Sequence, residues 1–346
     1  MMEYAIDPDI TVAHTLPGRF YSDAGTFRLM RERVFARTWQ WIGDLADVAS
    51  PCTLSPRDLL PGSLDEPLLL SRDEGGDLRC LSNVCTHRGN ILVKAACAAR
   101  QIRCGYHSRR FDLAGRMTFM PEFGDAKDFP SPADHLPRVA FREWAGLGFA
   151  SLSPALDFAD FFGDARAACE SLPVERMHPD PARSRDYEVR AHWALYVENY
   201  LEGFHIPFVH AGLNAVVDYG NYETRLHPYS NVQLARAKDG APAAQYWWIF
   251  PNLMLNFYDW GLSVNLVQPL DIDRTRVLFR SFVWDASKLE TGAGAALDRV
   301  EAEDEAIVLA VQRGVRSRFY GRGRYSPSRE RGVHHFHRLL CEFLAS

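Results

Sequence analysis

The spacing of apolar residues changes along the chain. Residues 24–38 carry apolar side chains three and four positions apart, which predicts an amphipathic helix. Residues 39–152 instead contain short apolar runs separated by Gly, Pro, Asp and Asn, a pattern typical of strands joined by turns. Strands are expected at residues 68–70, 78–84, 101–103 and 139–141. This part should be mostly β, with a Pro-rich loop at 129–134 and a boundary at 151–154.

The remainder of the chain mixes helical and strand patterns. Helices are expected at residues 193–205 and 295–319, and strands at 245–250, 263–267 and 276–284. Strands enclosed between two long helical segments favour an antiparallel sheet with the helices packed against it. The predicted fold class is therefore α+β, with an all-β N-terminal domain followed by a sheet-and-helix domain.

The composition excludes several classes of function. Hydrophobic residues make up 47% and charged residues 24% of the 346 positions, which fits a globular protein. Asp plus Glu (44) outnumber Lys plus Arg (39), so no positive field favours nucleic acid or an anionic membrane. We find neither a signal-peptide pattern nor an apolar run near the roughly 18 residues of a membrane span. Seven scattered cysteines argue against a disulfide framework, so we expect a cytoplasmic protein.

Two Cys-His pairs form the first candidate site: Cys85-Thr86-His87 and Cys104-Gly105-Tyr106-His107. Each pair lies in a turn-like segment beside an expected strand, where Gly89 and Gly105 give the backbone room to fold around a ligand. Two thiolates and two imidazoles suit either a tetrahedral zinc ion or a two-iron cluster. Zinc fingers more often group Cys with Cys and His with His. The mixed order instead suits two matching loops that each give one ligand to each iron.

At these residues the chain resembles the Rieske iron–sulfur family. The similarity extends from about Trp39-Gln40-Trp41-Ile42-Gly43 through both pairs to Phe111-Asp112. The resemblance implies a [2Fe–2S] cluster whose ligands are Cys85 and Cys104 on one iron and His87 and His107 on the other. Because imidazole carries less negative charge than thiolate, the reduction potential is expected to exceed that of an all-cysteine cluster.

One position departs from the family's pattern. The family usually has Gly-Trp after the last histidine, whereas this chain has Ser108-Arg109. The change removes no ligand. We expect it to expose a cation near the cluster and thereby to affect docking or the reduction potential.

A second dense group of polar residues begins at Asn199. On a helix, Asn199, Glu202 and His205 fall three positions apart and share one face. His210 lies five positions after His205 and would point away from it on an unbroken helix, but Pro207 disrupts the helix between them. For either histidine alone, a polar helix end with a capping histidine is the competing interpretation.

Asp304 shares the apolar face of the last predicted helix, which is formed by Leu297, Val300, Ile307, Val311 and Val315. Its acidic neighbours Glu301, Glu303 and Glu305 are expected off that face, in solvent. A carboxylate on a buried face must be paired, protonated or bound to a cation, and an ion pair with an arginine is the alternative to a metal. Two histidines and a carboxylate form the facial triad of a non-haem Fe(II) site, so His205, His210 and Asp304 are the candidate ligands.

The two sites together resemble the α subunits of Rieske non-haem iron oxygenases over nearly the full chain. The choline, carnitine and glycine-betaine oxygenases are the most similar branch, at residues 199–210, 250–256, 265–270 and 311–314. The acidic residue three positions before the first iron histidine is usually aspartate in the family, and here it is Glu202. The resemblance implies a Rieske domain over residues 39–152, a helix-grip catalytic domain over 153–346, and a helical segment, residues 1–38, that packs with the latter.

The resemblance also implies how the parts cooperate. A partner reductase with flavin or ferredoxin groups would pass electrons from NAD(P)H to the cluster, and O₂ and a small organic substrate would react at the mononuclear iron. In the family the relay crosses between subunits of a homotrimer, here from His107 of one subunit through Glu202 to His205 of the next. Glu202, with Asn199 beside it, is the candidate catalytic residue.

The substrate class stays open at the level of the sequence. Aromatic residues are dense in the last part of the chain: Tyr200, Phe204, Phe208, Trp247, Trp248, Phe250, Phe257, Tyr258 and Trp260. Such rings can bind a quaternary ammonium group through cation–π attraction, and hydroxylation of an N-methyl group would then end in demethylation. They would equally suit an aromatic or natural-product substrate, or simply a core. An electron-transfer protein with an inert second domain and a structural zinc protein are the rival classes.

Overall fold

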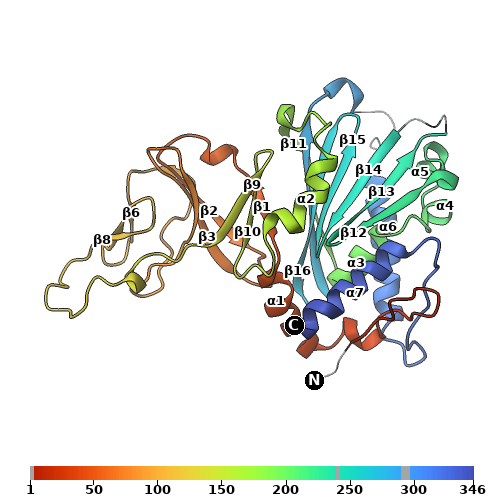
Figure 1. Ribbon diagram of the computed structural model, residues 1–346, viewed down its shortest axis with the longest axis horizontal. Helices are drawn as coiled ribbons and strands as arrows, with labels where there is room; N and C mark the ends of the chain where they lie inside the picture. The colour runs from red at the N-terminus through yellow and green to blue at the C-terminus, as the bar shows by residue number, and fades with distance from the viewer. Residues whose placement is uncertain (1–3, 239, 241, 290–296) are drawn as a thin grey trace. The chain divides into compact units, whose positions relative to one another are not determined.

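The chain divides into two compact units (Figure 1). A computed structural model describes residues 4–238, 240, 242–289 and 297–346. The larger unit comprises Met1–Thr38 with Leu156–Ser346, and the smaller unit comprises Trp39–Ala155. Strands dominate the smaller unit, whereas the larger unit combines a sheet with helices, so the predicted α+β fold class is confirmed.

Three antiparallel sheets make up the smaller unit, in the orders β1-β10-β9, β4-β3-β2-β5 and β6-β7-β8. Their strands are β1 (Gln40–Asp44), β2 (Thr53–Leu59), β3 (Glu66–Arg72), β4 (Leu78–Ser82), β5 (Cys97–Ala98), β6 (Ile102–Arg103), β7 (Arg110–Phe111), β8 (Met117–Phe119), β9 (Ala140–Trp144) and β10 (Leu147–Ser151). Short 3₁₀ helices occur at η3 (Ala46–Val48) and η4 (Pro132–Asp134). One of its apolar cores contains Cys85 and Cys104, so both thiols are buried beside the small β6-β7-β8 sheet.

A single seven-stranded antiparallel sheet forms the centre of the larger unit, in the order β11-β17-β16-β15-β14-β13-β12 (Figure 1). The strands are β11 (His178–Val189), β12 (Glu223–His227), β13 (Ser230–Arg236), β14 (Pro242–Ile249), β15 (Leu253–Tyr258), β16 (Gly261–Asp271) and β17 (Arg274–Val283). Ten consecutive residues of β16 are buried, and this strand lies inside the sheet between β17 and β15. The three strand segments expected from the sequence belong to β14, β16 and β17.

The larger unit also contains helices, and several of them pack against this sheet. The helices are α1 (Ala24–Arg33), α2 (Phe158–Ala168), α3 (Trp193–Tyr200), α4 (Ile206–Val209), α5 (Ala211–Val216), α6 (Leu297–Gly314) and α7 (Arg331–Ala345), with 3₁₀ turns at η1 (Gly18–Tyr21), η2 (Phe35–Arg37), η5 (Val174–Arg176), η6 (Tyr219–Asn221) and η7 (Ala286–Lys288). Helix α3 contacts β16 and α6, α2 contacts β13 and β14, and α7 contacts β12. None of these described helices combines the length and apolar character needed to cross a membrane.

Several expected helix boundaries differ from the structure. The helix expected over residues 24–38 is α1 followed by the separate turn η2. The helix expected over 193–205 ends at Tyr200, which matters for the site because three candidate residues follow. The helix expected over 295–319 ends at Gly314, and residues 295–296 lie outside the described part of the chain. Helices α2 and α7 were not predicted.

Candidate active site

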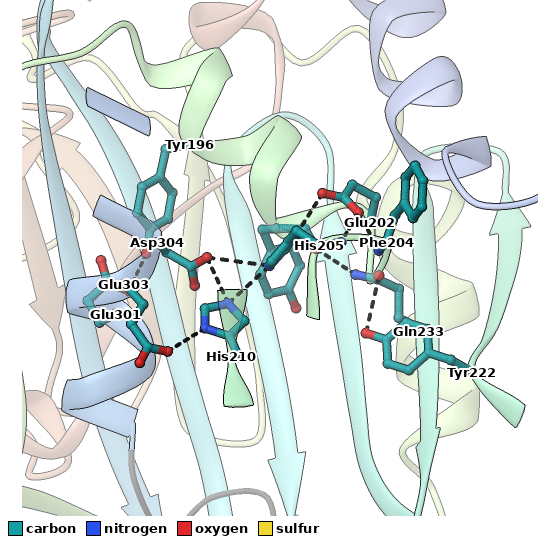
Figure 2. A network of polar contacts seen from close by, with 11 residues as sticks. Tyr196, Glu202, Phe204, His205, His210, Tyr222, Gln233, Glu301, Glu303 and Asp304 are labelled. Carbon is teal, nitrogen blue, oxygen red and sulfur yellow. Dashed lines mark hydrogen bonds and ion pairs between the residues drawn. The ribbon is translucent and has the colours of Figure 1, made fainter. Parts of the chain in front are cut away.

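His205, His210 and Asp304 meet at one point in the larger unit (Figure 2). Their facing atoms form a small triangle: His205 Nε2 lies 3.1 Å from His210 Nε2, and Asp304 Oδ1 lies 3.1 Å from His210 Nε2 and 3.4 Å from His205 Nε2. Nitrogen and oxygen ligands about 2.0–2.2 Å from one metal ion lie roughly 3 Å apart when the bonds are at right angles. The triangle therefore fits one metal ion bound by all three side chains. Two imidazoles and one carboxylate are the donor set of non-haem Fe(II).

A break in the backbone, rather than one continuous helix, brings the two histidines together. Helix α3 ends at Tyr200, and His205 and His210 flank the four-residue helix α4 at its two ends. Pro207 lies in the first turn of α4, where no helical hydrogen bond needs the N–H group that proline lacks. The prediction that Pro207 interrupts a longer helix is therefore wrong. The expectation that Asn199, Glu202 and His205 share one helical face is therefore wrong.

The loop between α3 and α4 needs a glycine. A Cβ atom on Gly203 would lie 2.6 Å from the ring of Tyr222, so only glycine lets the loop lie flat against that ring. The same loop places the carboxylate of Glu202 against the backbone N–H groups of Phe204 and His205. Glu202 is thereby held next to the first histidine although no helix links them.

Each histidine is fixed by its own glutamate (Figure 2). Oε1 of Glu202 lies 2.6 Å from Nδ1 of His205, and Oε2 of Glu303 lies 2.8 Å from Nδ1 of His210. With Nδ1 donating to a carboxylate, Nε2 of each ring points toward the shared point, where its lone pair would bind a metal ion in place of a proton. This arrangement orients a ligating histidine and increases its basicity.

Hydrogen bonds among the three candidate ligands shift the pKa values of all three. Burial alone would lower the pKa of His205, but its hydrogen bonds to Asp304 and Glu202 outweigh burial and raise it to about 9. The pKa of His210 is also raised, because the bond to Asp304 outweighs burial. Burial would raise the pKa of Asp304, yet its bonds to the two histidines lower it. Within the described residues, Asp304 forms ion pairs with His205 and His210. The alternative of an ion pair between Asp304 and an arginine is therefore not found there.

Helix α6 presents a different face to the interior from the one predicted. Ile307 and Val311 are exposed, whereas Glu301 is buried with 6% of its surface accessible. Glu301 accepts a hydrogen bond of 2.6 Å from the hydroxyl of Tyr196, and burial raises its pKa to about 8. Glu303 binds His210 instead of standing in solvent. Helix α6 thus contributes three carboxyl groups, of Glu301, Glu303 and Asp304, to the surroundings of the site.

A cavity of about 120 Å³ opens beside the three candidate ligands. Apart from these ligands, the residues that line it are mostly aromatic, amide and aliphatic: Tyr196, Asn199, Tyr200, Glu202, Ile206, Leu213, Tyr222, Gln233, Tyr246, Asn256, Tyr258, Asn265, Phe279, Leu297, Val300 and Glu301. Of the aromatic residues predicted from the sequence, only Tyr200 and Tyr258 line it. Phe204 and Phe208 are exposed, and the other predicted aromatic residues are buried elsewhere. Asn199 lies at the wall of the cavity.

The two Cys-His pairs lie on two loops of the smaller unit with the same backbone pattern. In the first loop the Cys85 N–H donates to the carbonyl of Asn90 (2.9 Å) and the Gly89 N–H donates to that of Cys85 (3.0 Å). In the second loop the Cys104 N–H donates to Arg109 (2.8 Å) and the Ser108 N–H donates to Cys104 (3.1 Å). Ser108 also has a positive φ of 58°, close to the 68° of Gly89 at the equivalent position.

The side chains of the two loops converge in like pairs. Cys85 and Cys104 are buried, unbridged and within hydrogen-bond contact of each other. The rings of His87 and His107 lie 4.7 Å apart between centroids. Nδ1 of His107 is buried and has no hydrogen-bond partner among the described residues. Two thiols on one side and two imidazoles on the other, one with an unused nitrogen, fit a two-iron cluster of the Rieske type.

Arg109 is not the exposed cation that was expected. Only 1% of its surface is accessible, and its guanidinium forms an ion pair of 2.6 Å with Asp134. The rings of Phe111 and Phe129 lie 5.7 and 5.6 Å from the guanidinium carbon. The buried cation is thus held by one carboxylate and two aromatic rings.

Comparisons with known proteins agree with these sites. Residues 44–130 match the Rieske [2Fe-2S] domain, and residues 223–346 match the catalytic domain of the ring hydroxylating alpha subunit. The first match contains all four Cys and His residues of the two loops, and the second contains Asp304. The chain belongs to the Rieske non-haem iron oxygenases, and it is an oxidoreductase with a Rieske [2Fe–2S] cluster and a mononuclear iron as cofactors.

Its relatives include oxygenases of quaternary amines. Choline monooxygenase of Arabidopsis thaliana is 28% identical over 96% of this chain and 84% of its own length. The carnitine monooxygenase oxygenase subunit of Escherichia coli K12 is 28% identical over 95% of this chain and 94% of its own length. The quaternary ammonium Rieske monooxygenase CntA in complex with L-carnitine has the same fold, with a TM-score of 0.83, 23% identity and 99% of each chain covered. The predicted family is therefore confirmed.

Proposed function

We propose that the protein is the oxygenase component of a Rieske monooxygenase that hydroxylates an N-methyl group of a small quaternary amine, leading to demethylation. The observation that carries this proposal is the convergence of His205, His210 and Asp304 beside a cavity lined by tyrosines. Family membership and the relatives named above agree with it. In this proposal residues 39–152 form the cluster domain, and residues 153–346, with residues 1–38 packed against them, form the catalytic domain.

His205, His210 and Asp304 would hold the iron on one face and leave the opposite positions open to O₂ and substrate. When bound, the iron supplies O₂ activation and the cluster supplies single electrons. Glu202 and Glu303 keep the two imidazoles oriented by accepting hydrogen bonds from their Nδ1 atoms. Asn199, at the cavity wall, would contact the substrate or the bound O₂ as a catalytic residue.

Cys85 and Cys104 would bind one iron of the cluster, and His87 and His107 the other. The like pairing of the side chains and the unused Nδ1 of His107 support this assignment. The two equivalent loops are also what a cluster bound from two sides requires.

Electrons would reach the iron through Glu202 of a neighbouring subunit in a homotrimer. Tyr106 is 59% exposed and stacks on His107 with ring centroids 3.7 Å apart, so the end of the cluster site that carries His107 adjoins an exposed aromatic ring. Phe204, 42% exposed, lies in the same loop as Glu202, and Phe208, 80% exposed, lies in the following helix α4. If Tyr106 of one subunit packed against Phe204 and Phe208 of the next, His107 of the first subunit could donate a hydrogen bond to Glu202 of the second.

A flavin- or ferredoxin-containing reductase supplied by NAD(P)H would deliver the electrons to the cluster. The predicted location of the protein is the cytoplasm.

A quaternary ammonium substrate fits the cavity for two reasons. Tyrosine rings attract a cation through their π faces, and Tyr200, Tyr222, Tyr246 and Tyr258 all line the cavity. The carboxyl group of Glu301 lies in the same wall, where a cationic ligand would favour its ionised form. A neutral aromatic substrate would gain from the rings but would leave Oε1 of this carboxyl group without a partner among the described residues.

The test is a binding screen of quaternary amines against aromatic acids, with substrate-dependent oxidation of the reduced cluster as the readout. We expect purified protein to be red-brown, with two cluster irons and one further iron per chain, and to respond to a quaternary amine. A response to aromatic acids alone would replace the proposed substrate by an aromatic one. A colourless, zinc-loaded protein would contradict the assignment of both metal sites.

A further inference from the structure

The buried Arg109 and the partly exposed Asp134 form an ion pair that touches both loops proposed to bind the cluster. The guanidinium Nη2 donates to Oδ1 of Asp134 at 2.6 Å and to its backbone carbonyl at 3.3 Å. That carbonyl also accepts a hydrogen bond of 2.8 Å from the hydroxyl of Thr86, which stands between Cys85 and His87. The backbone carbonyl of Arg109 accepts from the N–H of Cys104. A single ion pair thus connects the first loop, the second loop and the turn η4.

The turn that carries Asp134 is itself well fixed. Oδ2 of Asp134 accepts hydrogen bonds from the backbone N–H and the hydroxyl of Ser131, at 2.7 and 3.0 Å. These bonds and the charge of Arg109 lower the pKa of Asp134. The carboxylate is therefore ionised at neutral pH, and both partners of the pair carry a full charge.

We propose that the Arg109–Asp134 ion pair is a positioning element of the cluster site that joins the two loops and sets the reduction potential of the cluster with its fixed charges. The proposal rests on the assignment of the cluster to Cys85, His87, Cys104 and His107. Charges out of contact with water are screened weakly, so a buried guanidinium acts on a nearby redox centre more strongly than a surface arginine does.

The sign of the effect differs for the two partners. Reduction adds an electron to the cluster, so a nearby cation favours the reduced form and a nearby anion disfavours it. Arg109→Met leaves the carboxylate of Asp134 without its cation, and the midpoint potential should fall. Asp134→Asn leaves the guanidinium without its anion, and the midpoint potential should rise. The double variant should return toward the wild-type value, because both charges are gone.

The experiment is a redox titration of the purified holoprotein, followed by the visible absorption and the electron paramagnetic resonance signal of the reduced cluster. Arg100→Met is the matched control, because Arg100 belongs to the same unit but has 85% of its side chain exposed. Its midpoint potential should equal that of the wild type. Arg109→Lys keeps the charge without the planar fork and should shift the potential less than Arg109→Met.

Opposite shifts in the two single variants support the proposal, because loosening of the loops would move both in the same direction. If Arg109→Met fails to assemble a cluster, an upward shift in Asp134→Asn still supports the role of the charges. Shifts of the same sign, or an unchanged potential in Asp134→Asn, overturn it. Absence of any Rieske signal in the wild type would instead refute the cluster assignment itself, so the two failures are distinguishable.

Discussion

Glu303 and His210 are joined by a hydrogen bond of 2.8 Å between Oε2 and Nδ1, although Glu303 directly precedes the candidate ligand Asp304. Successive residues of one helix point about 100° apart, so their side chains normally contact different parts of the protein. Here one turn of α6 supplies a carboxylate to the candidate metal position and a second carboxylate to a candidate histidine ligand. An equivalent hydrogen bond joins Oε1 of Glu202 to Nδ1 of His205, the other candidate histidine ligand.

Replacing Glu303 by Ala should weaken iron binding about 10- to 100-fold, the usual cost of removing a partner behind a metal-binding histidine. Glu303→Gln should weaken it less, because the amide oxygen can still accept the proton of Nδ1. Iron content after dialysis against graded chelator concentrations measures the effect. Glu175→Gln, an exposed glutamate of the same unit, is the control and should retain iron like the wild type. Equal iron retention in Glu303→Ala and the control would contradict the role of Glu303.

Replacing Glu202 by Gln should leave both metal sites filled but should separate cluster oxidation from product formation. Glutamine still accepts from Nδ1 of His205, so that ring keeps its orientation, but the negative charge that we propose to attract the cluster histidine of a neighbouring subunit is lost. We expect the single-turnover yield of product per oxidised cluster to fall about 10-fold or more. Metal analysis of the same sample serves as the control. A wild-type yield would exclude Glu202 as the bridge.

His192 should make the protein less stable in acid. Burial lowers the pKa of His192 from 6.5 to about 3, because the charged ring cannot be hydrated between its aromatic neighbours. Between these two values the unfolded chain binds a proton that the folded protein rejects. The free energy of unfolding is therefore unaffected above pH 6.5 and falls by up to about 1.4 kcal/mol per pH unit below it.

Urea unfolding at a series of pH values from 7.5 to 5 measures this slope. His192→Asn removes the titrating ring while keeping a side chain able to cap α3, as the Nδ1 of His192 does toward the N–H of Ala194. The variant should be less stable than the wild type at pH 7.5 but should lose less stability on acidification. The exposed His178→Asn is the matched control and should keep the wild-type slope. Parallel slopes for all three proteins would show that His192 is not responsible.

The sequence was sufficient for features that depend on residue order and local spacing. The mixed order of Cys85, His87, Cys104 and His107 predicts two equivalent loops, and the structure shows equivalent hydrogen bonds in both. The proximity of His205 and His210 was also predicted, but for the wrong reason. Helix α3 ends at Tyr200, and Gly203 of the following loop lies against Tyr222, a contact between segments that local spacing cannot reveal.

The environment of charged side chains could not be predicted in this way. Glu301 is buried because Tyr196 of α3 donates to it, and Arg109 is buried because Asp134 and two phenylalanines surround it. Hydrophobic periodicity treats such residues as solvent-facing, since it contains no information about a partner elsewhere in the chain. A charged residue where a family usually has an aromatic one, as at Arg109, is the available signal that such a partner exists.

Tyr258→Leu should weaken the binding of a quaternary amine more than that of its neutral isostere, in which carbon replaces the nitrogen. Both ligands lose packing against the ring of Tyr258, which lines the cavity and contacts Tyr246 at 6.0 Å between centroids. Only the cation also loses its attraction to the π face, worth about 0.5–2 kcal/mol, or roughly 2- to 30-fold in Kd. Calorimetric titration of both ligands into wild type and variant gives the two ratios. Phe257→Leu, a buried ring of the same strand that does not line the cavity, is the control and should affect both ligands alike. An equal loss for the two ligands in Tyr258→Leu would mean that the ring only fills space, and the cation–π argument for the substrate would fail.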